Sequence, residues 1–255
     1  MLFDTHAHLD DDALFPQVEQ VLARAKTAGV GFINSVGCSL SSSRRNVELA
    51  HKYPDVYATV GVHPSESQDM NEDAMAQLLA LARQPKVVAW GEIGLDYHYE
   101  DDTPHELQQE YFRRQIILAK EAGKPIVIHD RDAHQDVMDI LREMRAGENG
   151  GILHCFSGSW EMAKFCLELG FMISFAGPLT YKNARVPVEV AAKVPLDMIL
   201  VETDSPYLTP QPFRGHTNEP SFVKYTAAKM AEIRGMDPER IAEITAANAR
   251  RVFGL

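Results

Sequence analysis

Short apolar runs alternate with longer stretches of helical periodicity along nearly the whole chain. The runs are rich in Val, Ile, Leu and Phe and rarely alternate apolar with polar residues, which is typical of strands buried on both faces. They predict eight strands, at Leu2–His8, Gly31–Gly37, Tyr57–His63, Val87–Leu95, Pro125–Arg131, Ile152–Ser157, Phe171–Gly177 and Met198–Asp204.

Helical patterns fill the intervals between these runs. Apolar residues recur every three or four positions over residues 15–25, and Gly29 stands where a helix end favours glycine. A capping box is predicted at Thr103, Pro104 and Glu106, and a last helix is predicted from Asp237 and Pro238 toward Val252. The helix after Thr103 is expected to have one apolar face, made of Leu107, Tyr111, Leu118 and Ala122.

Eight strand-plus-helix units in 255 residues predict one (β/α)8 barrel of the TIM type, a single domain over residues 1–255. A doubly wound open sheet is the alternative. No Gly-rich phosphate-binding turn follows an early strand, so the sequence offers that alternative little support.

Polar residues, most of them of metal-binding types, cluster at the ends of the predicted strands. They are His6, His8, His63, Glu92, Asp96, His129, Arg131, His154, Glu202 and Asp204. In a (β/α)8 barrel the carboxyl ends of all strands meet at one face, where catalytic residues lie. Any one of these residues has an ordinary explanation, such as a hydrogen-bonded core histidine or, for Asp204 before Ser-Pro, a turn. Together they would be costly to bury without a compensating cation.

The set favours two metals, because six good ligands exceed the three protein ligands of a common catalytic zinc site. The six are His6, His8, Glu92, His129, His154 and Asp204. Glu92 is the candidate bridge between the metals. Two cations roughly 3.5–4 Å apart can clamp the attacking and leaving oxygens of a phosphoryl transfer. Asp204 is expected to bind one metal and to act as general base, so Asp204 and Glu92 are the catalytic candidates.

Composition narrows the choice of partners. The net charge of −11 argues against a general nucleic-acid coat protein, although a few arginines and cations at one mouth can still bind a phosphate chain. Three cysteines without a CxxC pair suit a reducing cytosol. Neither a signal peptide nor a membrane span is evident from the sequence. We therefore expect a cytoplasmic monomer without membrane contact.

Eight motifs in order resemble the TatD family of metal-dependent hydrolases: FDTHAHLD, GVHP, GEIGLDY, IVIHDRDA, GGILHCFSG, ISFAGP, VETDSPYLTP and PFRGHTNEP. The resemblance covers nearly the whole chain. It implies an amidohydrolase-like barrel with a two-metal centre and a deoxyribonuclease-like, 3′→5′ exonuclease activity on single-stranded DNA, sometimes on RNA. It also implies that His6, His8 and Asp204 hold one metal, that His129 and His154 hold the second, and that Glu92 is shared. The metals are expected to be Mg, Mn or Zn.

Secondary roles follow from residue type and position. Arg131 and Arg214 are candidates for substrate phosphates, or for surface ion pairs. His63 is a candidate for the leaving group or a phosphate, or for a structural hydrogen bond. Glu202 is expected to support a metal ligand from behind.

The aromatic residues near the motifs are expected to divide between rim and core. Phe156 and Tyr207 are placed at the rim, where they would stack on a base or pack against neighbouring loops. Trp90 is placed in the core.

Three other functions remain open. An amide hydrolase of this kind often uses a carboxylated lysine, which the fourth predicted strand lacks. A small-molecule phosphoesterase would use the same centre. A metal-holding scaffold without turnover is the third alternative, and it would need no exchangeable water.

Overall fold

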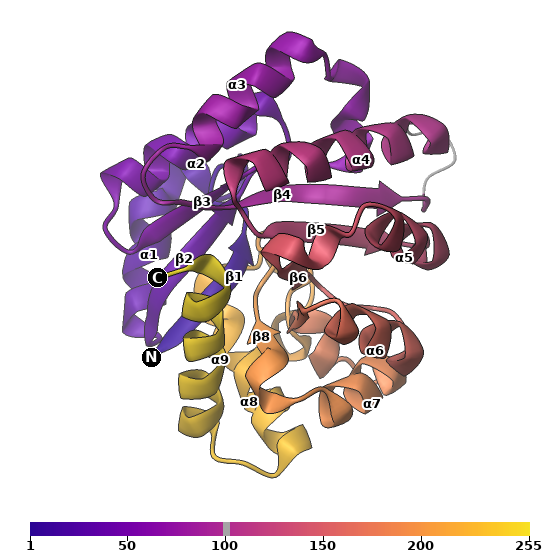
Figure 1. Ribbon diagram of the computed structural model, residues 1–255. Coiled ribbons are helices and arrows are strands. Elements are labelled where there is room, and N and C mark those ends of the chain that lie inside the picture. Colours follow the sequence, from indigo (N-terminus) through magenta and orange to yellow (C-terminus); the bar gives the residue numbers. More distant parts are fainter. Residues whose placement is uncertain (99–102) are drawn as a thin grey trace.

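The apolar runs form eight parallel strands that curve into a barrel, with helices around the outside, in a computed structural model that describes residues 1–98 and 103–255 (Figure 1). The strands are β1 (Leu2–Ala7), β2 (Val30–Val36), β3 (Val56–Val60), β4 (Val87–Asp96), β5 (Ile126–Arg131), β6 (Gly151–Leu153), β7 (Phe171–Phe175) and β8 (Ile199–Val201). Each strand pairs with the next in chain order. The predicted (β/α)8 architecture is confirmed.

The last and first strands meet through backbone contacts just beyond their ends. Ala7 and Ser205 form a parallel bridge, Asp204 N–H donates to the His6 carbonyl at 2.9 Å, and His8 N–H donates to the Ser205 carbonyl at 2.7 Å. These bonds place the segment after β8 directly beside the carboxyl end of β1.

The helices within the described residues are α1 (Val18–Thr27), α2 (Leu40–Lys52), α3 (Glu72–Ala82), α4 (His105–Ala122), α5 (His134–Glu143), α6 (Trp160–Glu168), α7 (Arg185–Lys193), α8 (Val223–Arg234) and α9 (Pro238–Phe253). The predicted last helix is confirmed: the Asp237 side chain caps it and Pro238 opens it. Gly29 follows α1 with a φ of 86°, as expected. No helix among these combines the length and apolarity needed to cross a membrane.

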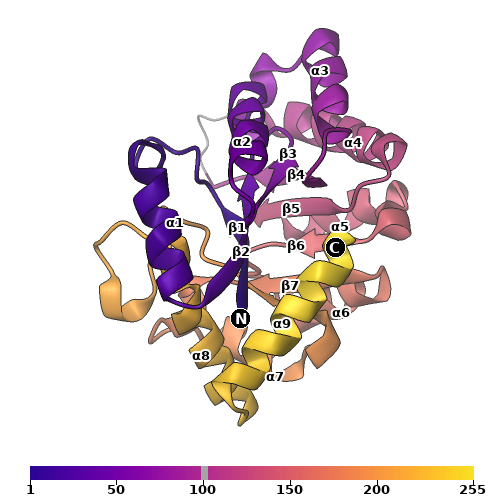
Figure 2. The ribbon, with the colours of Figure 1, turned by 90° about the vertical axis from the view of Figure 1, so that its left-hand side faces the viewer.

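The amino-terminal end of the barrel is closed by α9, which runs diagonally in front of the strands beside the N-terminus in Figure 2. Ala246, Ala249 and Phe253 of α9 pack in one buried cluster with Phe3, and the Phe3 and Phe253 ring centres lie 5.7 Å apart. Because this end is sealed by apolar side chains, the carboxyl ends of the strands form the open end of the barrel.

One local prediction about α4, the capping box, is wrong, and the prediction of its apolar face is incomplete. The residue that caps α4 is Pro104, without a side-chain hydrogen bond, and the helix starts at His105. The Thr103 hydroxyl instead donates to the Ser65 carbonyl at 2.8 Å, so no capping box forms with Glu106. The buried face of α4 consists of Gln108, Phe112, Gln115, Ile116 and Ala119, whereas Tyr111, Leu118 and Ala122 of the expected face are only partly buried.

Several strands are shorter at their carboxyl ends than predicted. β3 ends at Val60, β6 at Leu153 and β8 at Val201, so His63, His154 and Asp204 stand in the loops that follow.

Candidate active site

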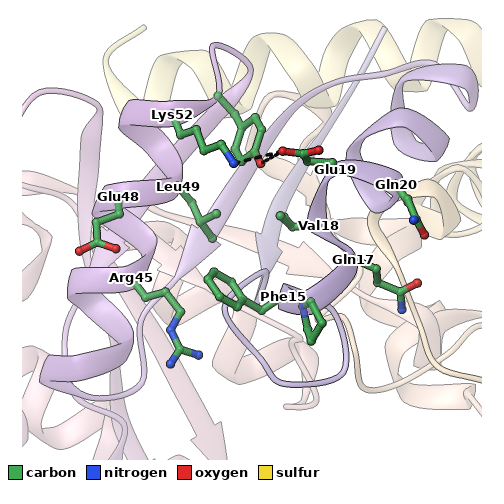
Figure 3. Close-up of a pocket in the computed structure, with 11 residues that line it drawn as sticks. Phe15, Gln17, Val18, Glu19, Gln20, Arg45, Glu48, Leu49 and Lys52 are labelled. Carbon is green, nitrogen blue, oxygen red and sulfur yellow. Dashed lines mark hydrogen bonds and ion pairs between the residues drawn. The ribbon is translucent and has the colours of Figure 1, made fainter.

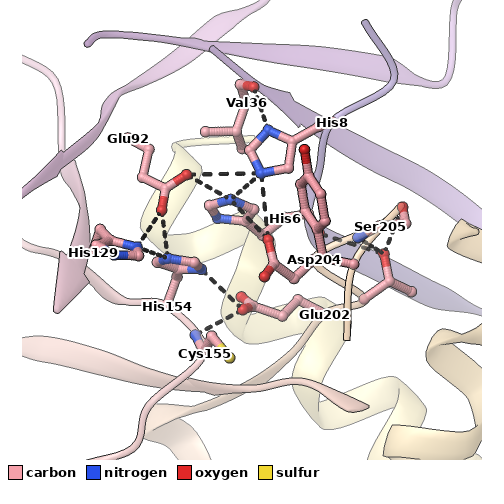
Figure 4. Close-up of polar contacts among 12 residues, drawn as sticks. His6, His8, Val36, Glu92, His129, His154, Cys155, Glu202, Asp204 and Ser205 are labelled. Carbon is pink, nitrogen blue, oxygen red and sulfur yellow. Dashed lines mark hydrogen bonds and ion pairs between the residues drawn. The ribbon is translucent and has the colours of Figure 1, made fainter. Parts of the chain in front are cut away.

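Five side chains from four segments gather around Glu92 at the open end of the barrel (Figure 4). The two carboxylate oxygens of Glu92 contact different pairs of histidine rings. Its Oε2 lies 3.3 Å from His6 Nε2 and 3.7 Å from His8 Nε2. Its Oε1 lies 2.8 Å from His129 Nδ1 and 2.7 Å from His154 Nε2. One carboxylate thus joins two pairs of imidazole rings.

Asp204 completes the side of the cluster that holds His6 and His8. Its Oδ1 lies 3.3 Å from His8 Nε2 and 3.7 Å from His6 Nε2, and the two ring nitrogens are 3.3 Å apart. We call His6, His8, Asp204 and the Oε2 side of Glu92 the first group. His129, His154 and the Oε1 side of Glu92 form the second group.

The backbone brings the two groups together at close quarters. Gly94 of β4 has a φ of 145°, and a Cβ atom there would stand 1.9 Å from the His129 carbonyl of β5. Only glycine permits this approach, which holds Glu92 and His129 on adjacent strands within contact distance. Asp204 adopts a φ of 57°, a turn conformation that aspartate tolerates better than most residues.

Three of the four rings are oriented by a hydrogen bond on the nitrogen that faces away from Glu92. His8 Nδ1 donates to the Val36 carbonyl at 3.0 Å, His129 Nε2 to Asp96 Oδ2 at 2.9 Å, and His154 Nδ1 to Glu202 Oε1 at 3.2 Å. Metal-binding histidines commonly have such an outer partner, which fixes the tautomer. In the neutral ring, the inner nitrogen then carries a free lone pair.

The donor set fits a cation. His129 Nδ1 and His154 Nε2 both point at the same carboxylate oxygen within 2.8 Å. Because the outer nitrogens carry the protons, the lone pairs of these two ring nitrogens would face those of the carboxylate oxygen, unless a proton or a metal ion lies between them. Imidazole and carboxylate donors suit Zn and Mn, with Mg accepted at the oxygen-rich positions. The groups His6–His8–Glu92 and Glu92–His129–His154 both have ligand atoms close enough for one ion.

A third close set, His63, Asp96 and His129, is less suited to a metal. The Nδ1 atom of His63 accepts the Ser65 N–H at 3.2 Å and lies 2.8 Å from the Ser65 hydroxyl. The His129 nitrogen nearest Asp96 is already bonded to it. Neither imidazole therefore offers this set a free lone pair.

Both carboxylates of the cluster are ionised despite burial. Burial alone would raise the pKa of Glu92, but the His154, His6 and His129 rings hold it well below its ordinary value when protons take the place of metal ions at the inner nitrogens. Burial likewise opposes ionisation of Asp204, yet His8 and the neighbouring rings lower its pKa in the same way. The site therefore presents anionic oxygen ligands at neutral pH.

Glu202 is fully buried directly behind His154. Besides His154, its Oε1 accepts the Cys155 N–H at 2.7 Å, and its Oε2 accepts the Ser174 hydroxyl at 2.5 Å. These three bonds fix the carboxylate against the ring, as expected for a residue that supports a ligand.

The remaining candidates lie around the mouth. The guanidinium of Arg214 lies over the Tyr181 ring at 4.5 Å, and Arg131 is exposed at the end of β5. The His63 ring lies against His129, with ring centres 4.4 Å apart. None of these three belongs to the two groups around Glu92.

Of the three predictions about aromatic residues, one is wrong. Tyr207 is 54% exposed beside the first group, whereas Phe156 is only 6% exposed and packs in the core, so its placement at the rim is wrong. The loop after β6 turns inward there, as Phe156 N–H donates to the Ser174 carbonyl of β7. Trp90 is fully buried, as predicted.

Sequence reasoning gave no role to two contacts of the cluster. Asp96 was visible at the end of the fourth predicted strand, and its spacing from Glu92 was the available signal. Cys38 Sγ lies 3.5 Å from His8 Nδ1, and no motif pointed to this contact.

A cavity of about 480 Å³ lies away from this cluster, between α1 and α2 (Figure 3). Arg45 covers the Phe15 ring in it at 4.7 Å, and Lys52 pairs with Glu19 at 3.1 Å. None of the candidate ligands lines it, so it does not compete with the cluster as the reactive centre.

An eight-stranded barrel with a buried histidine–carboxylate cluster at the carboxyl ends of its strands defines a metal-dependent hydrolase. The chain belongs to the TatD family, since the family described as TatD related DNase matches residues 3–254.

Individual relatives match over their full length. YabD of Bacillus subtilis, a metal-dependent hydrolase, is 49% identical over 253 residues, with 99% of each chain covered. The 3′-5′ ssDNA/RNA exonuclease TatD of Edwardsiella piscicida is 35% identical over 260 residues, with all of both chains covered. The crystal structure of the TatD homologue YjjV from Escherichia coli K12 superposes with a TM-score of 0.94 at 34% identity, covering 100% of this chain and 98% of that one.

Proposed function

We propose that the chain is a two-metal phosphodiesterase that removes nucleotides from the 3′ end of single-stranded DNA, and also of RNA. The observation that carries this proposal is the geometry of Glu92, whose two oxygens face two separate groups of ligand atoms. Two divalent cations, drawn from Mg, Mn or Zn, would be held by His6, His8 and Asp204 on one side and by His129 and His154 on the other, with Glu92 shared. Such cations lower the pKa of water and neutralise charge on a phosphate.

Asp204 is the proposed proton acceptor. It is a carboxylate at neutral pH, and it stands at the mouth side of the first group with its Oδ1 toward His8. Its backbone is fixed by the bond from its N–H to the His6 carbonyl. A base positioned in this way can take a proton from water in reach of both groups.

His63 is the proposed hydrogen-bond donor to a phosphate oxygen or to the leaving oxygen. Since its Nδ1 accepts the Ser65 N–H, the proton of the neutral ring is on Nε2. Burial and the neighbouring His129 lower the pKa of His63 to about 3, so the ring remains neutral at physiological pH. It can donate a hydrogen bond there without carrying a charge.

Arg131 and Arg214 are proposed to attract the phosphate chain on the side of the mouth formed by the later strands. Both are exposed, and each guanidinium can offer paired donors to phosphate oxygens. The exonuclease name of the Edwardsiella relative supports a nucleic-acid substrate with 3′→5′ polarity. A monomer acting in the cytoplasm is part of the same proposal.

The test is hydrolysis of 3′-labelled and 5′-labelled single-stranded oligonucleotides after chelator treatment and return of Mg, Mn or Zn. Stepwise loss from the 3′ end is expected, and it should vanish in Asp204→Asn and in Glu92→Gln. Asp139→Asn, which changes a half-exposed aspartate on α5, is the matched control and should behave like the wild type.

Two outcomes would change the proposal. Cleavage within the strand, or from the 5′ end, would contradict the polarity. Failure to cleave any oligonucleotide while metals are bound would refute the nuclease and favour a small phosphoester substrate, which bis(4-nitrophenyl) phosphate hydrolysis would reveal.

A further inference from the structure

We propose that Tyr207 is the platform for the terminal nucleobase of the strand, and that Asp11 beside it keeps a further phosphate away from this side of the mouth. The inference rests on the proposed nuclease function and adds to it the reason why a strand end is preferred over an interior position.

Tyr207 is held rigidly next to the first group. Its N–H donates to the Asp204 carbonyl at 2.9 Å, and its own carbonyl accepts the Asn218 side chain at 2.6 Å. At the other end of the side chain, its hydroxyl donates to Asp11 Oδ2 at 2.9 Å. The ring centre is 5.9 Å from that of His8. The ring is therefore fixed at both ends, close to where a scissile phosphate would bind.

A fixed ring that is 54% exposed is prepared for stacking. An aromatic side chain that is already ordered loses little conformational freedom when a base lies on it. Stacking of this kind accepts any base, because every base has an aromatic face.

The Asp11 carboxylate distinguishes a strand end from an interior position on the Tyr207 side of the mouth. Its Oδ2 accepts the Tyr207 hydroxyl at 2.9 Å and its Oδ1 accepts the Ala13 N–H at 2.8 Å. Arg45 lies on the same side, but it bonds to the Asp10 carbonyl at 2.8 Å and lies 3.8 Å from Asp12. A phosphate at contact distance from Asp11 is repelled. A terminal nucleoside, which carries no further phosphate, fits beside it.

Binding to the metal-loaded protein tests the platform without requiring turnover. The probes are 2′-deoxyadenosine 5′-monophosphate and 2-deoxyribose 5-phosphate, which differ only by the base. In the wild type the nucleotide should bind about 10- to 100-fold more tightly, the range expected for one stacked base. In Tyr207→Leu this ratio should fall to near one. Ile117→Ala, an equally exposed side chain on α4, should keep the wild-type ratio.

Hydrolysis tests the role of Asp11. Oligonucleotides that end in a 3′-phosphate should be cut more slowly than those that end in a 3′-hydroxyl. Asp11→Asn should narrow this difference by about fivefold, the effect of removing one charge at contact distance in water.

The possible results separate the inference from the proposed function. An unchanged binding ratio in Tyr207→Leu overturns the platform, and an unchanged preference for the 3′-hydroxyl in Asp11→Asn overturns the role of the charge. If the wild type shows the binding ratio but cuts no oligonucleotide, the nuclease proposal fails while the nucleobase platform stands. Metal content equal to that of the wild type confirms that each variant is folded.

Discussion

Replacement of Glu202 by glutamine tests whether the buried carboxylate behind His154 strengthens metal binding by the proposed ligands. The side chain is fully buried and accepts three hydrogen bonds, from His154 Nδ1, Cys155 N–H and the Ser174 hydroxyl. Glutamine has the same shape. Its amide oxygen can still accept from His154 and Cys155, and its NH2 group can donate to Ser174, whose hydroxyl can turn to accept. The variant should therefore fold.

The expected loss is in metal binding. Removing the negative charge behind His154 weakens the ring as a ligand, and mutation of such outer partners typically costs about 10- to 100-fold in metal affinity, or about 1.4–2.8 kcal/mol. Glu202→Ala is a different perturbation. It leaves three buried donors without an acceptor, at about 1–3 kcal/mol each. The alanine variant should consequently lose several kcal/mol of folding stability as well.

The assay is competition for Zn or Mn against a chromophoric chelator, alongside urea unfolding of the metal-free proteins. The glutamine variant should show weaker binding with a nearly unchanged unfolding midpoint, and the alanine variant should be affected in both measurements. The reasoning is refuted if the glutamine variant binds metal as tightly as the wild type, because His154 would then not depend on its outer partner.

Three further predictions concern other parts of the molecule. His63→Asn should lower kcat by at least about 100-fold, the low end for loss of a positioned proton donor. The pH–rate profile between pH 5 and 8 should keep its shape, because the pKa of His63 is about 3. A change of the profile in that range would contradict this role. The hydrogen bond from His134 to Asp130 raises the pKa of His134. The bond therefore stabilises the fold fully below the ordinary pKa of histidine, and this contribution is lost as pH rises through the raised pKa. His134→Asn should lower the free energy of unfolding in urea by at most about 0.5 kcal/mol at pH 5.5 and by less at pH 8.5, and the reverse order would refute the linkage. Phe253→Ala should cost about 3–5 kcal/mol by emptying the apolar closure of the barrel, with metal affinity of the folded protein unchanged; a loss of affinity would show that the two ends of the barrel are coupled.

The barrel and the cluster of ligand residues were predictable because both depend on order along the chain. Buried parallel strands appear as continuous apolar runs, and the fold brings every carboxyl end to one face. A polar residue at the end of such a run, such as His129 after Ile128, is therefore placed by topology alone. No knowledge of contacts was needed to put these side chains near Glu92.

The details that failed depend on contacts between distant segments. Gln108 and Gln115 are buried on α4 because they bond to backbone groups of Asp96 and Val62, and helical periodicity counts such residues as polar. The Thr103 hydroxyl is drawn away from the helix end by the Ser65 carbonyl. In each case the decisive partner lies more than ten residues away, where a local pattern carries no information.

A chain with a net charge of −11 can still bind a polyanion if the negative charge at the mouth is neutralised. The six candidate ligands together with Asp96 and Glu202, which bond to His129 and His154, contribute four carboxylates, a formal −4 that two divalent cations would cancel. Surface charges further away are largely screened, since the Debye length is about 10 Å at 0.1 M salt. Metal-free protein should therefore bind a fluorescent single-stranded oligonucleotide weakly or not at all, and the metal-loaded protein should bind it with an affinity that falls as salt rises. His63→Asn leaves every proposed metal ligand in place and slows cleavage of the strand during this anisotropy measurement. Equal binding with and without metal would show that the basic residues alone hold the strand.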